Sequence, residues 1–261
     1  MRITAGQGGS KEGTQIHRRS NLLSPLGVML LGLQMAALGF LGGAQDEPDL
    51  AAKRKAMVAR QIAARGVGDP LVLKAMSEVP RHLFVPAGVA GEAYQDYPLP
   101  IGEGQTISQP YIVALMTECL TLEGGEKVLE VGTGSGYQAA VLGRIAASVY
   151  TIEINGTLAR QAAATLERLG FANIHVRAGD GFFGWPEEAP FDAMMVTAAA
   201  PDVPPALFAQ LAEGGRLVIP LGDPRTYQRL TVITKRKGKP RVEQVLDVRF
   251  VPMTGEILKK K

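Results

Sequence analysis

The sequence is poor in residues that bind metals or form disulfides. It contains one cysteine, Cys119, which excludes an internal disulfide and a thiolate metal cluster. Cys119 falls in the apolar pattern of residues 111–122, which favours a buried structural thiol. The three histidines, His17, His82 and His175, are scattered without the spacing of metal ligands. We therefore predict no metal site.

The main part of the chain also lacks net charge. The 261 residues include 28 lysines and arginines against 25 aspartates and glutamates, a formal charge of +3. Residues 1–45 hold the whole surplus, and the remaining 24 basic and 24 acidic residues cancel. A neutral body has no basic surface that would attract nucleic acid, so we expect no nucleic-acid partner. An apolar content of 46% is typical of a globular protein, and the length fits one large domain or two small ones.

The beginning of the chain contains a long stretch without charge. No charged residue occurs from Ser20 to Gln45, and Arg18-Arg19 precede this stretch. It ends in the small residues Gly42-Gly43-Ala44. A basic start, an apolar middle and a small-residue end are typical of a secretory signal. We expect residues 18–44 to direct export to the periplasm, with cleavage after Ala44. The alternatives are an uncleaved membrane anchor and an extension from an over-early start codon. The uncleaved anchor is the one membrane contact that we would expect.

The rest of the chain, residues 46–261, divides into two parts. Residues 49–65 and 70–77 have helical periodicity, whereas residues 80–109 are rich in proline and glycine and have little periodicity. Irregular segments of this length are usually functional or disordered, and the apolar content argues against disorder. We therefore expect N-terminal helices and a substrate-site loop in residues 46–110, and a cofactor-binding sheet in residues 111–261.

The second part alternates between apolar β-branched runs and helical stretches. The expected strands are residues 127–131, 149–154, 173–178, 191–196 and 216–220, and the expected helices are residues 138–147, 157–169 and 204–212. Alternating strands and helices imply a mostly parallel sheet with helices on both faces. Residues 229–234 and 243–251, joined by a charged tip, predict an antiparallel hairpin at one edge.

A glycine-rich turn follows the first of these strands. Residues 128–138 read Val-Leu-Glu-Val-Gly-Thr-Gly-Ser-Gly-Tyr-Gln, so the glycines are Gly132, Gly134 and Gly136. A dinucleotide fingerprint needs the spacing G-x-G-x-x-G, because a pyrophosphate lies on the helix N-terminus. The spacing here is G-x-G-x-G, and Glu130 suits the cationic amino group and sulfonium of S-adenosylmethionine. A tight turn that binds no ligand is the alternative.

A second carboxylate supports an adenosine-containing ligand. Glu153 lies near the end of the next strand, about 20 residues beyond the glycines, where an acid accepts hydrogen bonds from both ribose hydroxyls. Dinucleotide sites share this feature, so Glu153 does not separate S-adenosylmethionine from a nicotinamide cofactor.

Two segments together resemble a known family. Residues 99–110, Leu-Pro-Ile-Gly-Glu-Gly-Gln-Thr-Ile-Ser-Gln-Pro, and residues 128–137 are similar to those of the protein-L-isoaspartate O-methyltransferases. The similarity continues through residues 179–181, 191–193, 213–218 and 249–253, and it covers residues 53–255. The glycine turn is shared by many methyltransferases, whereas Thr-Ile-Ser-Gln-Pro is much more specific. The leader is a departure, because the usual family member is cytoplasmic; a cytoplasmic location is therefore the alternative to export.

The resemblance implies a Rossmann-like, S-adenosylmethionine-dependent methyltransferase with a mostly parallel seven-stranded sheet. It implies transfer of a methyl group to the α-carboxyl of L-isoaspartyl residues in damaged proteins and peptides. The ester then closes to a succinimide, whose hydrolysis returns some normal aspartate. We expect the enzyme to be a monomer.

The resemblance also assigns roles to individual residues. It implies that Ser108 is the active-site residue, which orients the acceptor carboxylate, although by itself Ser108 would be a turn residue. The residues implied for the cofactor are Glu130 near its methionine end, Gly132, Gly134 and Gly136 along it, Glu153 at the ribose, and Asp180 and Gly181 at the adenine. Those implied for the substrate cleft are Thr106, Ile107, Ser108 and Thr254.

Two other functions remain open at this point. A nicotinamide-dependent oxidoreductase would need the G-x-G-x-x-G spacing and a catalytic Tyr/Lys or Cys/His group, and neither is evident. A non-catalytic protein on the same fold would have lost the glycines or Ser108, and both are present.

Overall fold

The computed structural model describes residues 48–223 and 225–259, and the export segment predicted for residues 18–44 lies outside them. Residues Asp46–Lys261 form one compact unit, in which the N-terminal helices and the sheet belong together. Within the described ranges, no helix combines the length and the apolar character that crossing a bilayer requires.

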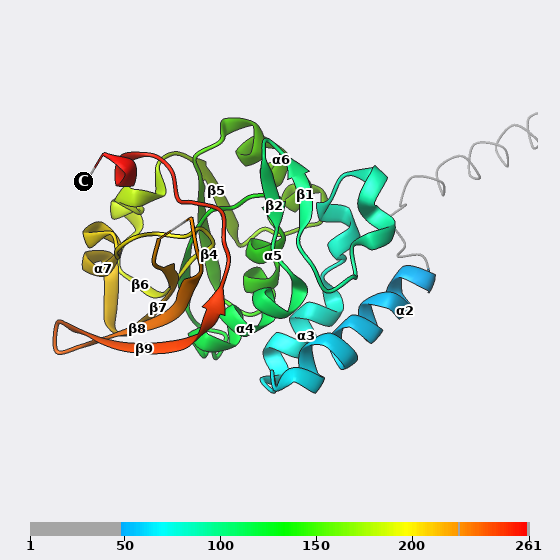
Figure 1. The fold of residues 1–261 in the computed structure, drawn as a ribbon, viewed down its shortest axis with the longest axis horizontal. Helices are drawn as coiled ribbons and strands as arrows, with labels where there is room; N and C mark the ends of the chain where they lie inside the picture. Colours follow the sequence, from blue (N-terminus) through cyan, green and yellow to red (C-terminus); the bar gives the residue numbers. More distant parts are fainter. Residues whose placement is uncertain (1–47, 224, 260–261) are drawn as a thin grey trace, which may run out of the picture. The chain divides into compact units, whose positions relative to one another are not determined.

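The unit is built on a sheet of seven strands in the order β5-β4-β3-β6-β7-β8-β9 (Figure 1). The strands are β3 (Lys127–Val131), β4 (Ser148–Glu153), β5 (Ile174–Ala178), β6 (Phe191–Val196), β7 (Leu211–Leu221), β8 (Gln228–Arg236) and β9 (Lys239–Val248). The first five in sequence are parallel neighbours, and β7, β8 and β9 pair antiparallel. The edge hairpin predicted from the sequence is therefore present as β8 and β9.

The central strands contribute to two hydrophobic clusters. Val128 of β3 and Met195 of β6 pack in one cluster, whereas Leu129 and Met194 pack in the other. Because successive side chains of a strand point to opposite faces, the sheet is buried on both sides, as parallel sheets are. The predicted fold class, a mostly parallel Rossmann-like sheet of seven strands with helices on both faces, is confirmed.

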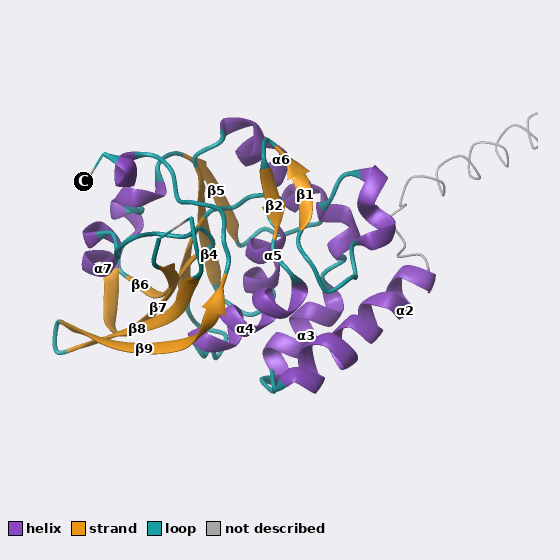
Figure 2. Ribbon diagram, in the orientation of Figure 1, coloured by secondary structure: helices purple, strands orange, loops and turns teal. Residues whose placement is uncertain are grey.

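Helices and short turns cover the two faces (Figure 2). The first cluster includes residues of α3 (Pro70–Glu78), α4 (Pro110–Leu120), α5 (Tyr137–Gly143) and α6 (Gly156–Arg168). The second includes residues of α7 (Pro205–Gln210), η5 (Gly181–Phe183) and η7 (Glu256–Leu258). Side chains cap two of the helices: Asp69 accepts from Leu71 N at the start of α3, and Asn155 accepts from Thr157 N at the start of α6.

The N-terminal part contains more regular structure than the sequence predicted. The first predicted helix is α2 (Pro48–Met57) followed by η1 (Val58–Ile62) and η2 (Ala63–Arg65). The segment predicted to be irregular contains η3 (Arg81–Phe84), η4 (Ala87–Glu92) and a hairpin of β1 (Leu99–Gly102) and β2 (Gln105–Ile107). The hairpin turn uses positive φ at Glu103 and Gly104, and a turn signal of this kind escaped the periodicity analysis.

Two predicted helices end earlier than expected. The helix predicted for residues 138–147 ends at Gly143, and Ala147 N then donates to the Glu126 carbonyl as the chain leads into β4. The helix predicted for residues 204–212 ends at Gln210, because Leu211 pairs with Phe191 and begins β7. A short turn, η6 (Pro186–Glu188), precedes β6.

The last strand also ends early, at Val248 rather than at residue 251. Beyond it the chain, red in Figure 1, runs to the carboxyl end of β6. There Ala199 N donates to the Val251 carbonyl, and Met253 N donates to the Ala199 carbonyl, both at 2.8 Å. Pairing with Ala199 draws these residues away from β8 and toward the end of the sheet where the glycine turn lies.

Candidate active site

The order of the strands reverses between β3 and β6. From β3 the chain proceeds through α5 to β4 on one side, and it returns from β5 to β6 on the other. Ligands of open α/β sheets bind outside the carboxyl ends of the strands at such a switch point. Gly132 directly follows β3 and Thr197 directly follows β6, so these two residues mark the position expected for a ligand.

A cavity of about 330 Å³ lies at this position. Its wall combines the glycine turn, the end of β4 and the segment that follows β9. The lining residues are Gln105, Thr106, Val131, Gly132, Gly134, Ile152, Glu153, Ile154, Asn155, Gly181, Thr197, Ala198, Val251, Pro252, Met253 and Thr254. We call it the donor cavity.

The three glycines of the turn have different surroundings. Gly132 has a φ of 100°, and a Cβ there would overlap Thr197 Oγ1, whose hydroxyl donates to the Gly132 carbonyl at 2.7 Å. Gly134 also lines the donor cavity and has a φ of 54°. Gly136 does not line it; it is the N-cap of α5, and a Cβ would meet Leu166 of α6. Two glycines thus shape the cavity and the third permits close helix packing.

Glu153 projects a fixed carboxylate into the donor cavity. Its side chain lines the cavity and is 7% exposed. Oε2 accepts a hydrogen bond from Gly134 N at 2.8 Å, and Oε1 accepts one from Asn155 N at 2.9 Å. Each carboxylate oxygen can accept a further hydrogen bond, so the pair remains able to bind two neighbouring hydroxyl groups.

Glu130 lies behind the turn and does not line the cavity. It is 0% exposed, and burial raises its pKa to about 8. Its Oε2 accepts from Thr151 Oγ1 at 2.6 Å, and the Thr151 hydroxyl is 2.6 Å from that of Thr133 in the glycine turn. The structure therefore connects Glu130 to the turn through two hydroxyl groups. The expectation that Glu130 lies beside the methionine end of a ligand is not met, because its side chain does not reach the cavity.

A second cavity of about 660 Å³ adjoins the first. The two share Thr106, Thr197, Val251 and Pro252. The other lining residues of the second cavity are Arg65, Pro98, Ser108, Gln109, Tyr111, Ile112, Tyr227, Leu246, Asp247, Val248, Arg249 and Phe250. We call it the acceptor cavity. Of the residues predicted for the substrate, Ser108 lines only the acceptor cavity and Thr106 lines both cavities. Ile107 is buried and lines neither.

Asp180 and Thr254 lie where the segment after β9 closes the donor cavity. Thr254 and Gly181 line it, whereas Asp180 does not. The Asp180 carboxylate instead accepts from Phe182 N at 2.9 Å and from Glu256 N at 2.7 Å. Asp180 thus ties the C-terminal segment to η5 and supports the wall from behind.

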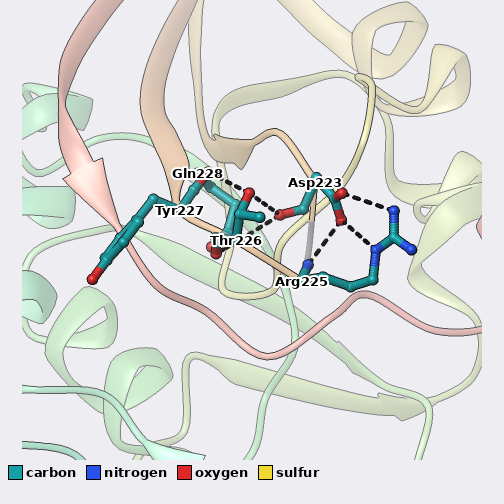
Figure 3. A network of polar contacts seen from close by, with 5 residues as sticks. All are labelled: Asp223, Arg225, Thr226, Tyr227 and Gln228. Carbon is teal, nitrogen blue, oxygen red and sulfur yellow. Dashed lines mark hydrogen bonds and ion pairs between the residues drawn. The ribbon is translucent and has the colours of Figure 1, made fainter.

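A polar network supports the far wall of the acceptor cavity (Figure 3). The buried Gln228 side chain donates to the carbonyls of Asp223 and Thr226, and its Oε1 accepts from Phe250 N at 2.8 Å. Figure 3 shows Tyr227 pointing away from the Asp223–Arg225 ion pair. Gln228 therefore fixes the positions of Tyr227 and Phe250, which both line the cavity.

Sequence reasoning missed Thr197, Gln228 and Arg81. Thr197 directly follows the strand predicted for residues 191–196, and a doubly wound strand order would have placed it beside the glycine turn. Gln228 and Arg81 carry no sequence signal, because their partners are carbonyl and amide groups brought together by the fold. In the part of the chain that the structure covers, no three or more His, Cys, Asp or Glu side chains are grouped to hold a metal ion.

A doubly wound sheet with a G-x-G-x-G turn and a carboxylate at its switch point defines the class of S-adenosylmethionine-dependent methyltransferases. Comparison with known proteins identifies the family. The family model described as protein-L-isoaspartate(D-aspartate) O-methyltransferase matches residues 52–258, and the chain belongs to this family.

Individual relatives agree. The protein-L-isoaspartate O-methyltransferase 2 of Shewanella sediminis is 56% identical over 232 residues, which cover 89% of this chain and 95% of the relative. A solved protein-L-isoaspartate O-methyltransferase structure is 32% identical, with a TM-score of 0.71, and covers 78% of this chain and 67% of that one. A Plasmodium falciparum structure, described as a beta-aspartate methyltransferase in complex with S-adenosyl-L-homocysteine, is 27% identical, with a TM-score of 0.68, and covers 77% of this chain and 98% of that one.

Proposed function

We propose that the two adjoining cavities hold the methyl donor and the methyl acceptor of a protein-repair reaction. As a member of its family, the chain is an S-adenosylmethionine-dependent enzyme that methylates the α-carboxyl of L-isoaspartyl residues in damaged proteins and peptides. One observation carries the division of the site: the glycine turn and Glu153 line one cavity, Ser108 lines the other, and the two share four residues. The nicotinamide oxidoreductase and the non-catalytic protein are no longer alternatives.

The residues of the donor cavity fit S-adenosylmethionine. This cofactor supplies a methyl group on a sulfonium centre. Glu153 would accept from the two ribose hydroxyls with the lone pairs that Gly134 N and Asn155 N leave free. Gly132 would let the backbone come close to the methionine portion. Gly181, where a Cβ would overlap Val131, would leave room at the adenine end.

The acceptor needs orientation rather than a general base. An α-carboxyl group ionises well below neutral pH, so it enters the cavity as a carboxylate. With the cofactor bound, transfer of the methyl group to one of the carboxylate oxygens would break the carbon–sulfur bond, and the negative and positive charges would cancel. The Ser108 hydroxyl donates to the carboxylate and holds it in line, while Thr106 and Thr197, which line both cavities, lie where the donor and the acceptor meet. Proximity and a dry site then lower the barrier.

Selective labelling tests this function. The purified protein, with radiolabelled S-adenosylmethionine, should methylate an isoaspartyl peptide and leave the aspartyl peptide of the same sequence almost unlabelled. The reason is that only the isoaspartyl residue carries a free α-carboxylate, which is attached directly to Cα while the methylene lies in the main chain. The aspartyl residue carries its free carboxylate beyond the methylene of its side chain. Equal labelling of both peptides, or cofactor binding without labelling of either, would contradict the proposal.

We also propose that the chain is exported and acts as a monomer. Its sequence supports export through the order of charge, apolar run and small residues in residues 18–44. Light scattering on the purified protein tests the monomer: a mass of twice the chain's 27.7 kDa would contradict it.

A further inference from the structure

A buried arginine lies between the acceptor cavity and the glycine turn. Arg81, the first residue of η3, is 0% exposed. Burial lowers its pKa to about 10, so the guanidinium is still charged at neutral pH. A buried charge costs free energy unless it is hydrogen-bonded, and apolar residues of similar volume often stabilise a fold as well. The contacts of Arg81 therefore indicate what the charge contributes.

Two of the three guanidinium nitrogens donate to main-chain carbonyls. Arg81 Nε donates to the Ala93 carbonyl at 2.7 Å, where η4 ends. Arg81 Nη2 donates to the Ser108 carbonyl, also at 2.7 Å. The guanidinium is planar and its donors are fixed relative to one another, so it sets the distance between the two carbonyls. Because the carbonyl and the hydroxyl belong to the same residue, fixing the Ser108 main chain also limits where its hydroxyl can point.

The same guanidinium contacts the helix that follows the glycine turn. Its central carbon lies 4.8 Å from the centre of the Tyr137 ring. Tyr137 is buried and is the first residue of α5, directly after Gly136. Arg81 thus touches the segment that carries Ser108 and the element that begins at the glycine turn, while it lines neither cavity.

We propose that Arg81 is a positioning residue for methyl transfer. It holds the Ser108 main chain at a set distance from the glycine turn, so that the Ser108 hydroxyl orients the acceptor carboxylate toward the methyl group. Arg81 touches no reacting atom and acts through Ser108, so this inference rests on the role proposed for Ser108. A lysine cannot replace it, because an ammonium group does not present two donors in a rigid plane.

The test is the variant Arg81→Lys, which keeps the charge. We expect kcat with an isoaspartyl peptide to fall roughly ten- to hundred-fold, the range for losing one hydrogen bond to a charged group. The dissociation constant of S-adenosylmethionine, measured by calorimetry, should stay within about two-fold of the wild type, because the donor cavity is untouched. This binding also shows that the variant is folded.

Arg54→Lys is the matched control. Arg54 lies in the same N-terminal part, and its Nε donates to the Ser77 carbonyl at 2.6 Å, so it too is a guanidinium bound to the main chain. It lines neither cavity. We expect its kcat to remain at the wild-type value. If Arg54→Lys lowers kcat as much as Arg81→Lys, the effect is one of general stability and the proposal is overturned.

A double variant distinguishes positioning from any other contribution. If Arg81 acts through Ser108, then Arg81→Lys should lower kcat much less in a Ser108→Ala background than in the wild type. An equal reduction in both backgrounds, or no reduction in either, would overturn the proposal. If Arg81→Lys does not fold, Arg81→Gln takes its place. If neither variant folds, Arg81 contributes to stability alone, and the proposal is overturned. The wild-type peptide labelling and the single variant Ser108→Ala, run in the same assay, test the proposed function and the role of Ser108 separately.

Discussion

At the residue scale, Glu130 and Glu153 show how the same side chain acquires two different properties. Both lie on neighbouring parallel strands near the glycine turn. Glu153 reaches the cavity and accepts two backbone hydrogen bonds, which hold its oxygens in place. Glu130 points into the protein beneath the turn, where burial raises its pKa to about 8. The first is equipped to bind a ligand, and the second supports the turn that binds it.

Two substitutions separate donor binding from acceptor orientation. Glu153→Ala should weaken S-adenosylmethionine binding by about 1–3 kcal/mol, the scale for losing charged hydrogen bonds. Ser108→Ala should leave that binding nearly intact and lower turnover, because Ser108 lines only the acceptor cavity. Calorimetry and peptide methylation on both variants check this. Loss of cofactor binding in Ser108→Ala to the extent seen in Glu153→Ala would show that the roles are wrongly assigned.

Glu130 gives a pH dependence of stability. Its pKa is raised from 4.5 to about 8 in the folded protein, so between these values the folded state holds a proton that the unfolded state has released. The free energy of unfolding contributed by this group therefore falls as pH rises through that window. Glu130→Gln removes the titration, so the variant should gain stability relative to the wild type between about pH 5 and about pH 8. Urea denaturation across this range measures it; a difference that does not change with pH would contradict the expectation.

At the scale of elements, the site is formed where several segments meet. The turn after β3, the end of β4 at Glu153, the end of β6 at Thr197 and the segment after β9 each contribute a wall. Thr197 contacts both Gly132 and Val131 through its hydroxyl, at 2.7 and 3.1 Å. The packing leaves no room for a side chain at the first glycine, and so the turn and β6 are matched to one another.

Gly132→Ala should abolish cofactor binding. Alanine at this position would have to adopt an unfavourable positive φ, and its Cβ would overlap Thr197 Oγ1. This overlap would displace the turn. Gly66→Ala is the matched control, because Gly66 has a φ of 98° and open space around a Cβ. We expect both variants to lose stability from the backbone strain, on the order of 1–2 kcal/mol. Calorimetry should show that Gly66→Ala binds the cofactor as tightly as the wild type and that Gly132→Ala does not bind it. Equal binding by both variants would refute the close-packing argument.

At the scale of the whole molecule, residues 46–261 contain everything that the site needs. They form one compact unit, and both cavities are lined within it. Removal of residues 1–45 should therefore leave the melting temperature and the methylation of isoaspartyl peptide unchanged. A truncated protein that fails to fold or to bind cofactor would show that the leader takes part in the structure.

The export proposal has a separate measurement. Mass spectrometry of the protein from its own cells should find a mature N-terminus at Gln45, because cleavage is expected after Ala44. An intact leader in a membrane fraction would indicate an anchor. An unprocessed protein in the cytoplasm would refute export.

The sequence by itself determined the glycine turn, the family, and the chain order of the seven strands of the main sheet and the longer helices between them. These depend on neighbours along the chain: the alternation of apolar residues, the φ values that glycine permits, and the segment Thr106-Ile107-Ser108-Gln109-Pro110. It also located Glu153 at the end of its strand, where the structure finds it lining the donor cavity.

Only the tertiary structure decided which polar groups meet. Thr197 and Gly132 are 65 residues apart, and Arg81 and Ser108 are 27 apart, so no periodicity connects them. Their contacts depend on strand order and on the path of the chain between elements. Glu130 and Glu153 point to the same face of the sheet, because Glu130 is paired with Thr151, two residues before Glu153. The difference between a buried Glu130 and a cavity-facing Glu153 therefore depends on how close each lies to the end of its strand and on what packs there, because burial and hydrogen-bond partners set the properties of a charged group.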